Sequence, residues 1–156
     1  MNHWAMKSEP DVFSFQDLQN EEDQTVAWDG VRNYEARNNL QACAPGDKVL
    51  FYHSNARPSG VVAIAEVVSE PYPDPSQFDP DHAGYDPDSS EDDPTWYLVD
   101  IQAREALPRK VPLKEIKQDE ALEGSVLARR GRLSVVPLTA EEYERIVELA
   151  HQDTNG

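Results

Sequence analysis

The stretch with the richest chemistry is Trp28 to Leu40, which reads WDGVRNYEARNNL. It combines a large aromatic ring, a carboxylate, a turn glycine, two arginines and three asparagines. The pattern predicts a helix that begins near Asn33, and the first turn of a helix leaves backbone N–H groups free to bind a ligand. An aromatic wall beside such donors suits a planar ligand with polar edges. We therefore expect Trp28, Asp29 and Gly30 to belong to a pocket for a flat, hydrogen-bonding group.

Polar side chains at the ends of two predicted strands could complete this pocket. Lys7 and Ser8 end the first strand, whereas Tyr52, His53 and Ser54 end another. If these strand ends converge, their polar side chains surround one opening. Hydroxyl and amide groups at such an opening can contact the edge of a base while an aromatic ring stacks on its face.

A basic turn is predicted at Arg129, Arg130, Gly131 and Arg132. Three arginines around one glycine, in a chain this acidic, favour contact with an anion over a merely solvated turn. Phosphate is the expected anion if the pocket holds a base.

Strong catalytic and cofactor motifs are absent from the sequence. It contains no GxxxxGK[ST], GxGxxG, HExxH or GxSxG. The four histidines lack the spacing of metal ligands, and the acidic residues lack the arrangement of a calcium loop. We therefore expect no metal and no cofactor. An enzyme acting on a small nucleotide-like ligand, with His53 or Asp29 as the acid or base, is an alternative hypothesis.

The charge of the chain is strongly negative but uneven. The net charge is −16 and the pI is near 4.4, which argues against a general coating of nucleic acid. Residues 70–94 contain nine acidic residues and no lysine or arginine. Residues 101–137, in contrast, contain eight basic residues against five acidic ones. A local basic rim is therefore compatible with the overall acidity.

The composition predicts one water-soluble domain. A length of 156 residues is enough to bury a core, and the apolar stretches are too short to span a bilayer. No secretion leader precedes Trp4, and a single cysteine, Cys43, excludes an internal disulfide. We expect a cytoplasmic location, or a nuclear one in a eukaryote, and no membrane partner.

Hydrophobic patterning predicts an α+β domain over residues 1–150, followed by a frayed tail at 151–156. Strands are predicted at 3–7, 47–53, 61–70, 95–106 and 133–136. Short helices are predicted at 14–19, 33–42, 111–119, 120–128 and 139–149. The first and last begin with capping boxes at Ser14 and Thr139. Aromatic residues recur through the Pro/Asp-rich stretch 70–94, which favours an ordered wrap over the body of the domain.

Five longer motifs cover most of the chain. They are WAMKSEPDVFSFQDL (4–18), WDGVRNYEARN (28–38), GDKVLFYHSN (46–55), GVVAIAEVVSEPYPDPSQFDP (60–80) and LARRGRLSVVPL (127–138). Together they resemble the EVE domain, a family with a PUA-like fold. The resemblance implies a PUA-like pseudo-barrel of mixed strands flanked by short helices. It also implies a non-enzymatic role, the binding of a modified base.

Modified cytosine in DNA, methylated or hydroxymethylated, is the first candidate that the resemblance implies. A modified base in RNA or tRNA is an alternative, because the family is also similar to the YTH readers of methylated adenine in RNA. A module that binds only proteins is a third reading. The chain's net charge of −16 is more negative than that of an ideal DNA reader.

The resemblance also assigns roles to individual residues. Trp28 is expected to stack on the base, with Trp4 and Tyr52 as candidates for further rings of an aromatic cage. Residues expected to contact or position the edge of the base are Lys7, Ser8, Asp29 and Asn33, with Gly30 and Val31 in the same loop. Tyr52, His53 and Ser54 are expected to complete the wall. Residues expected to meet phosphate are Arg32, Arg129, Arg130 and Arg132.

Overall fold

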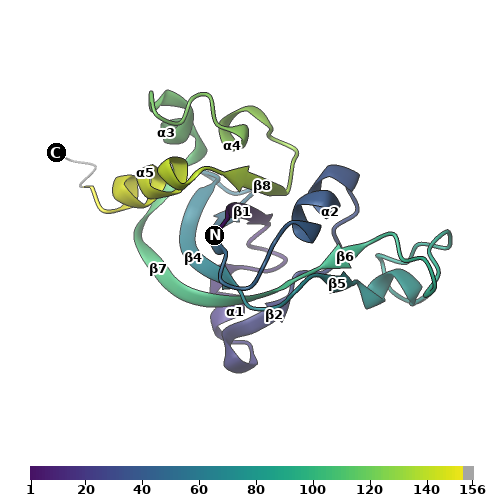
Figure 1. Ribbon diagram of the computed structural model, residues 1–156. Coiled ribbons are helices and arrows are strands. Elements are labelled where there is room, and N and C mark those ends of the chain that lie inside the picture. The colour runs from purple at the N-terminus through teal and green to yellow at the C-terminus, as the bar shows by residue number, and fades with distance from the viewer. Residues whose placement is uncertain (153–156) are drawn as a thin grey trace.

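A computed structural model describes residues 1–152 of the chain and shows a curled sheet with short helices around it (Figure 1). In this range the main sheet has six strands, in the order β2-β7-β4-β3-β1-β8. Its strands are β1 (His3–Ser8), β2 (Thr25–Ala27), β3 (Lys48–His53), β4 (Gly60–Val67), β7 (Asp100–Pro112) and β8 (Val135–Leu138). The expected α+β fold is confirmed.

Mixed pairing and bulges produce the curl of the sheet. β1 runs parallel to β3 and antiparallel to β8, whereas β3–β4 and β4–β7 are antiparallel. The register shifts once in the β3–β4 pair and twice in the β4–β7 pair. Because each bulge bends its strand and increases the local twist, the long strands β4 and β7 curve around the N-terminal strand (Figure 1). The result is the half-barrel that the sequence predicted.

Hydrophobic burial on both faces of the central strands holds this half-barrel together. Val49, Leu50 and Phe51 are consecutive and fully buried in β3. The strand predicted at 61–70 is present as β4, but it begins one residue earlier and ends three residues earlier. β4 is buried on both faces and ends at Val67, and Val68 is exposed.

Five short helices lie around the sheet within residues 1–152. They are α1 (Phe15–Gln19), α2 (Tyr34–Gln41), α3 (Leu113–Gln118), α4 (Val126–Arg129) and α5 (Ala140–Ala150). Both predicted capping boxes are present, Ser14 with Asp17 and Thr139 with Glu142. Each satisfies two backbone N–H groups at a helix start. Of the predicted frayed tail, His151 and Gln152 donate backbone hydrogen bonds to the end of α5, and residues 153–156 lie outside the described part.

The structure corrects the two helices predicted at 111–119 and 120–128. β7 continues to Pro112, because Val111 pairs with Val61 in the β4–β7 ladder. A helix follows only at 113–118, and the next begins at Val126 behind the N-cap Ser125. The predicted strand at 133–136 lies two residues later, at β8, and the strand predicted at 95–106 is divided between two sheets.

The Pro/Asp-rich stretch is ordered, as expected, but it forms an arm beside α2 instead of the expected wrap over the body of the domain (Figure 1). Its small sheet pairs β5 (Tyr72–Pro73) with β6 (Tyr97–Leu98), and a 3₁₀ helix, η2, spans Pro75–Phe78. The buried amide of Gln77 fastens the arm internally. Its Nε2 donates to the carbonyls of Asp74 and Trp96, and its Oε1 accepts from two backbone N–H groups.

Candidate functional site

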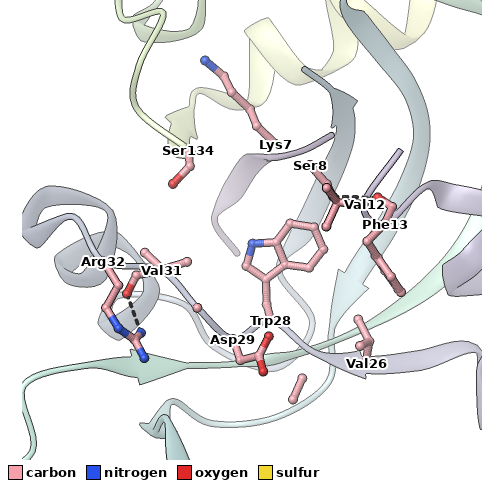
Figure 2. Close-up of a pocket in the computed structure, with 12 residues that line it drawn as sticks. Lys7, Ser8, Val12, Phe13, Val26, Trp28, Asp29, Val31, Arg32 and Ser134 are labelled. Atoms are coloured by element: carbon pink, nitrogen blue, oxygen red, sulfur yellow. Dashed lines mark hydrogen bonds between the residues drawn. The ribbon is translucent and has the colours of Figure 1, made fainter. Parts of the chain in front are cut away.

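A pocket of about 470 Å³ lies where the end of β1, the loop between β2 and α2, and the loop before β8 meet. This volume is within the range of small-ligand sites. The pocket is lined by Lys7, Ser8, Val12, Phe13, Val26, Ala27, Trp28, Asp29, Gly30, Val31, Arg32 and Ser134 (Figure 2). Seven of these residues were expected from the sequence, so the β1 end and the 28–32 loop do converge.

Trp28 is the large aromatic side chain of this pocket. Its ring is 8% exposed and packs edge-on against Phe51, with ring centroids 5.5 Å apart, and against Phe13 at 6.5 Å. Its backbone N–H donates to the Val99 carbonyl at 2.9 Å. The ring is therefore fixed from behind, and its remaining accessible part lies on the pocket side (Figure 2).

The indole N–H of Trp28 differs from those of the other two tryptophans. Trp4 Nε1 donates to Asp47 Oδ2 at 3.0 Å, and Trp96 Nε1 donates to Asp86 Oδ2 at 2.7 Å. Within residues 1–152, Trp28 Nε1 makes no hydrogen bond and is not sealed from solvent. It is a donor available to a ligand.

A buried carboxylate holds the loop that carries Trp28. Gly30 has a φ of +81°, a conformation that glycine adopts without strain, and its N–H donates to Asp74 Oδ2 at 2.8 Å. Asp74 is fully buried and also accepts from Arg32 Nη1 at 3.2 Å and from both the N–H and the hydroxyl of Ser76. Burial alone would raise the pKa of Asp74, but these hydrogen bonds hold it below its usual value.

Arg32 is part of this support. Its Nε and Nη2 donate to the Gly84 carbonyl, Nη2 also donates to Ser76 Oγ, and Nη1 donates to Asp74 Oδ2 and the Val31 carbonyl. A guanidinium has five N–H donors, and these five contacts occupy them. Arg32 therefore lines the pocket as a structural residue, and its predicted phosphate contact lacks a free donor.

Lys7 and Ser8 hold the opposite side of the pocket. Lys7 Nζ donates to the carbonyls of Arg130 at 3.3 Å and Gly131 at 3.2 Å, and lies 5.3 Å from the centre of the Tyr52 ring. Burial and the nearby positive charge of Lys117 lower the pKa of Lys7. Ser8 Oγ donates to the Phe13 carbonyl at 2.6 Å, so its lone pairs remain free to accept from a ligand.

Four residues expected at the site, Asn33 at the edge of the base and three in the wall, lie outside the pocket lining. Asn33 is the N-cap of α2, where its Oδ1 accepts from the Ala36 N–H at 2.9 Å. Tyr52 is 2% exposed beneath Lys7. His53 Nε2 accepts from the Phe15 N–H at 3.1 Å, and the Ser54 N–H donates to the Ser8 carbonyl. β3 and β1 are neighbours, as predicted, but the end of β3 supports the pocket from outside.

The two further aromatic candidates have structural positions. Trp4 lies near the other end of β1, where its indole is bonded to Asp47, so it belongs to the core. Tyr52 has its face covered by Lys7. Within the described residues, Trp28 is the tryptophan that reaches the pocket.

The basic turn lies at the rim of the pocket. Arg129, Arg130 and Arg132 are exposed, and the turn is tied to the pocket by Lys7 and by Ser134, whose carbonyl accepts from the Lys7 backbone N–H. Arg130 forms a bidentate ion pair with Glu35, at 2.7 and 3.1 Å, with both side chains about half exposed. Such an exposed pair is weak enough to open for another anion.

Sequence reasoning missed Asp74 and five residues of the lining, Val12, Phe13, Val26, Ala27 and Ser134. The motif Asp74-Pro75-Ser76 is typical of a helix N-cap and could have indicated the bond to Ser76. Its bonds to Gly30 and Arg32 join segments more than forty positions apart, which no local pattern reveals.

Two features, a cluster of metal ligands and a membrane-spanning helix, are absent from the part of the chain that the structure describes. No cluster of three or more His, Cys, Asp or Glu side chains there could hold a metal ion. No helix among residues 1–152 has the length and apolar character needed to cross a membrane.

The curled mixed sheet with short helices around it is the fold of a PUA-like domain. The model of the EVE domain family matches residues 2–149, so the chain belongs to this family. Mouse thymocyte nuclear protein 1 is 43% identical over 165 residues, which cover 95% of this chain and 73% of the mouse protein.

Solved structures agree with this assignment. The chain superposes with a TM-score of 0.94 on human thymocyte nuclear protein 1 in complex with DNA that contains 5-methylcytosine, at 40% identity over 98% of this chain and 99% of that one. A YTH domain from Zygosaccharomyces rouxii has a TM-score of 0.51 at 14% identity, over 99% of this chain and 91% of that one, and shares the fold.

Proposed function

We propose that this chain binds a modified base of a nucleic acid in the Trp28 pocket, and that modified cytosine in DNA is its first ligand. The observation that carries the proposal is the match to the human relative, solved with 5-methylcytosine-containing DNA, at 40% identity and a TM-score of 0.94. The pocket of about 470 Å³ around a fixed indole supplies a place for such a base.

The energetics require several contacts to act together. Removing a base from a duplex stack costs a few kcal/mol, whereas stacking on one aromatic side chain returns about 1–3 kcal/mol. Hydrogen bonds to the edge of the base and contacts to phosphate must supply the rest. The free lone pairs of Ser8 and the carboxylate of Asp29 are available for the edge.

Asp29 gives the pocket a preference that suits cytosine. Its carboxylate lines the pocket, and a carboxylate accepts readily from the exocyclic amino group of cytosine. The indole N–H of Trp28 lies in the plane of the stacking ring, so it is available to a group beside the base and not to the edge of the stacked base. A pocket with a strong acceptor can thus bind the amino edge of the base while its apolar residues contact a methyl group.

The positions of the histidines support binding without catalysis. His53 was, with Asp29, one of two candidates for the acid or base of an enzyme, but its ring nitrogen accepts from the backbone of α1 and the residue lies outside the pocket lining. Burial and the charge of Lys110 lower the pKa of His53, so its neutral form, which accepts this bond, is favoured.

RNA is the alternative nucleic acid, and the 2′-hydroxyl decides between the two. We propose DNA first because the match to the YTH domain, at 14% identity, extends to the fold alone. The name of the relatives supports a nuclear location in a eukaryote; a cytoplasmic location in a bacterium stays a prediction.

Variants of two residues test the proposal through their different effects. Trp28→Ala should abolish the preference for a modified over an unmodified duplex in a fluorescence-anisotropy titration. Trp28→Phe keeps a ring but loses the N–H, and should retain part of the preference. Arg130→Ala should weaken modified and unmodified duplexes alike and reduce the salt dependence.

Trp4→Phe is the matched control, because it also removes an indole N–H, but from the core. It should leave the preference unchanged once folding is checked by thermal unfolding. An equal loss of preference in Trp28→Ala and Arg130→Ala would refute this division of roles.

A further inference from the structure

The cations of this acidic chain are divided into two groups. Among the described residues, six of the fourteen lysines and arginines form ion pairs. The other eight have no carboxylate within ion-pair distance in that part of the chain: Lys7, Arg37, Arg57, Lys110, Lys114, Lys117, Arg129 and Arg132. More than half of the cations therefore stay unpaired in a chain with thirty carboxylates, and their positions need an explanation.

Two of these unpaired cations line a second groove. The groove has a volume of about 620 Å³ and lies between the β3–β4 loop and α3. Its floor contains the apolar side chains of Ala56, Pro58 and Leu113, whereas Lys114 and Lys117 provide its charge. We call it the lysine groove.

The groove is a built feature of the fold. Lys110 Nζ donates to the Pro58 carbonyl at 2.7 Å, and the Leu113 N–H donates to the Ser59 carbonyl at 2.9 Å. These bonds fasten the β3–β4 loop to the end of β7 and the start of α3. The one carboxylate on α3, Glu115, is neutralised by a bidentate pair with Arg109.

The lysine groove and the Trp28 pocket share no lining residue, but adjoining segments of the fold carry them. Lys7 lines the pocket, and the charge of Lys117 is close enough to contribute to the lowered pKa of Lys7. The β3–β4 loop begins at Ser54, whose N–H donates to the carbonyl of Ser8 in the pocket wall. The pocket at Lys7 and Ser8 and the groove on the loop that begins at Ser54 are thus joined through this hydrogen bond.

We propose that the lysine groove binds the sugar-phosphate backbone of the strand whose base enters the Trp28 pocket. This inference rests on the proposed function. An apolar floor suits a sugar, and lysines at the rim suit phosphates as point charges. Most contacts between proteins and DNA go to the backbone. In a chain with a net charge of −16, unpaired cations next to the pocket counteract a field that otherwise repels nucleic acid.

The double variant Lys114→Gln/Lys117→Gln tests the proposal on the full chain. The probes are two matched duplexes, one with a single 5-methylcytosine and one unmodified, titrated over a series of salt concentrations. Each lost phosphate contact should reduce the slope of log K against log salt by about 0.9, so two should reduce it by about 1.8. Both duplexes should weaken by the same factor, leaving the modified-to-unmodified ratio unchanged.

Lys48→Gln/Arg104→Gln is the control with the same change in net charge. Both of its residues pair with Glu66, and Lys48 lies opposite His3 at the far end of β1. If its slope falls as much as that of the groove variant, net charge alone explains the effect and the groove proposal is overturned.

The outcomes separate the two proposals. A wild-type chain without preference for the modified duplex overturns the proposed function. A retained preference with an unchanged slope in the groove variant overturns the groove alone and points to another occupant, such as an acidic peptide. Both groove lysines are exposed. Lys114→Glu is a second variant, and it should lower the slope more than Lys114→Gln does if folding is intact.

Discussion

A few polar residues decide the chemistry of the pocket, and Trp28 and Asp74 act in different ways. Trp28 faces the ligand site with a ring and an unused N–H. Asp74 lies behind it and fastens the loop through Gly30 and Arg32. We therefore expect binding to depend on Asp74, although this residue does not line the pocket.

Asp74→Asn is expected to destabilise the protein and loosen the pocket. The variant leaves the guanidinium of Arg32, which is mostly buried, without its charged partner. Breaking one side of such a pair costs about 3 kcal/mol in the free energy of unfolding. Denaturant unfolding measures this loss, with exposed Asp79→Asn on the same arm as control. Equal stabilities of the two variants would contradict the role of Asp74.

The difference in unfolding free energy between the wild type and Asp74→Asn should depend on pH. Because the pKa of Asp74 lies below its usual 3.8 in the folded state, the carboxylate stabilises the fold fully above that pH. This contribution is lost as the pH falls through the lower, folded-state pKa. The difference in unfolding free energy between the wild type and Asp74→Asn should thus shrink below about pH 4.

At the scale of elements, close contact between β4 and β7 sets the shape of the half-barrel. A Cβ at Gly60 would lie 2.3 Å from the Val111 carbonyl oxygen, which is backbone and cannot move aside alone. We expect Gly60→Ala to destabilise the protein by about 1–3 kcal/mol. Gly124→Ala is the matched control, because nothing lies within 4 Å of the added atom. Equal thermal unfolding midpoints would contradict this account.

Local signals explain which elements could be predicted from the sequence. The capping boxes at Ser14 and Thr139 involve residues three positions apart, so they can be read directly from the chain. The end of β7 could not be predicted in this way. Val111 is held in a strand by Val61, fifty positions away, and tertiary pairing prevails over local helix preference there.

The candidate site shows the same difference between features set by local sequence and features set by long-range contacts. The Trp28 loop and the Lys7–Ser8 strand end were predicted, because turn and strand-end residues are visible in the sequence. The alternation along β3 could not show that the His53 ring bonds to α1 instead of facing the pocket. The sequence also could not show that Arg32 donates its N–H groups to the arm, because Gly84, which accepts from it, lies 52 positions away.

For the whole molecule, the uneven charge is the feature that reconciles acidity with nucleic-acid binding. The acidic arm and the unpaired cations lie in different parts of the chain. Repulsion from the net charge of −16 should make binding modest, and the cations near the pocket should give it a definite orientation.

The most direct test of this account is the ratio of two affinities of the wild-type chain. Fluorescence anisotropy at low salt should compare matched oligonucleotides with and without 5-methylcytosine, as DNA and as RNA. We predict at least about tenfold tighter binding of the modified DNA, equivalent to about 1.4 kcal/mol. Equal affinity for modified and unmodified oligonucleotides of both kinds would contradict the claim that the Trp28 pocket binds a modified base.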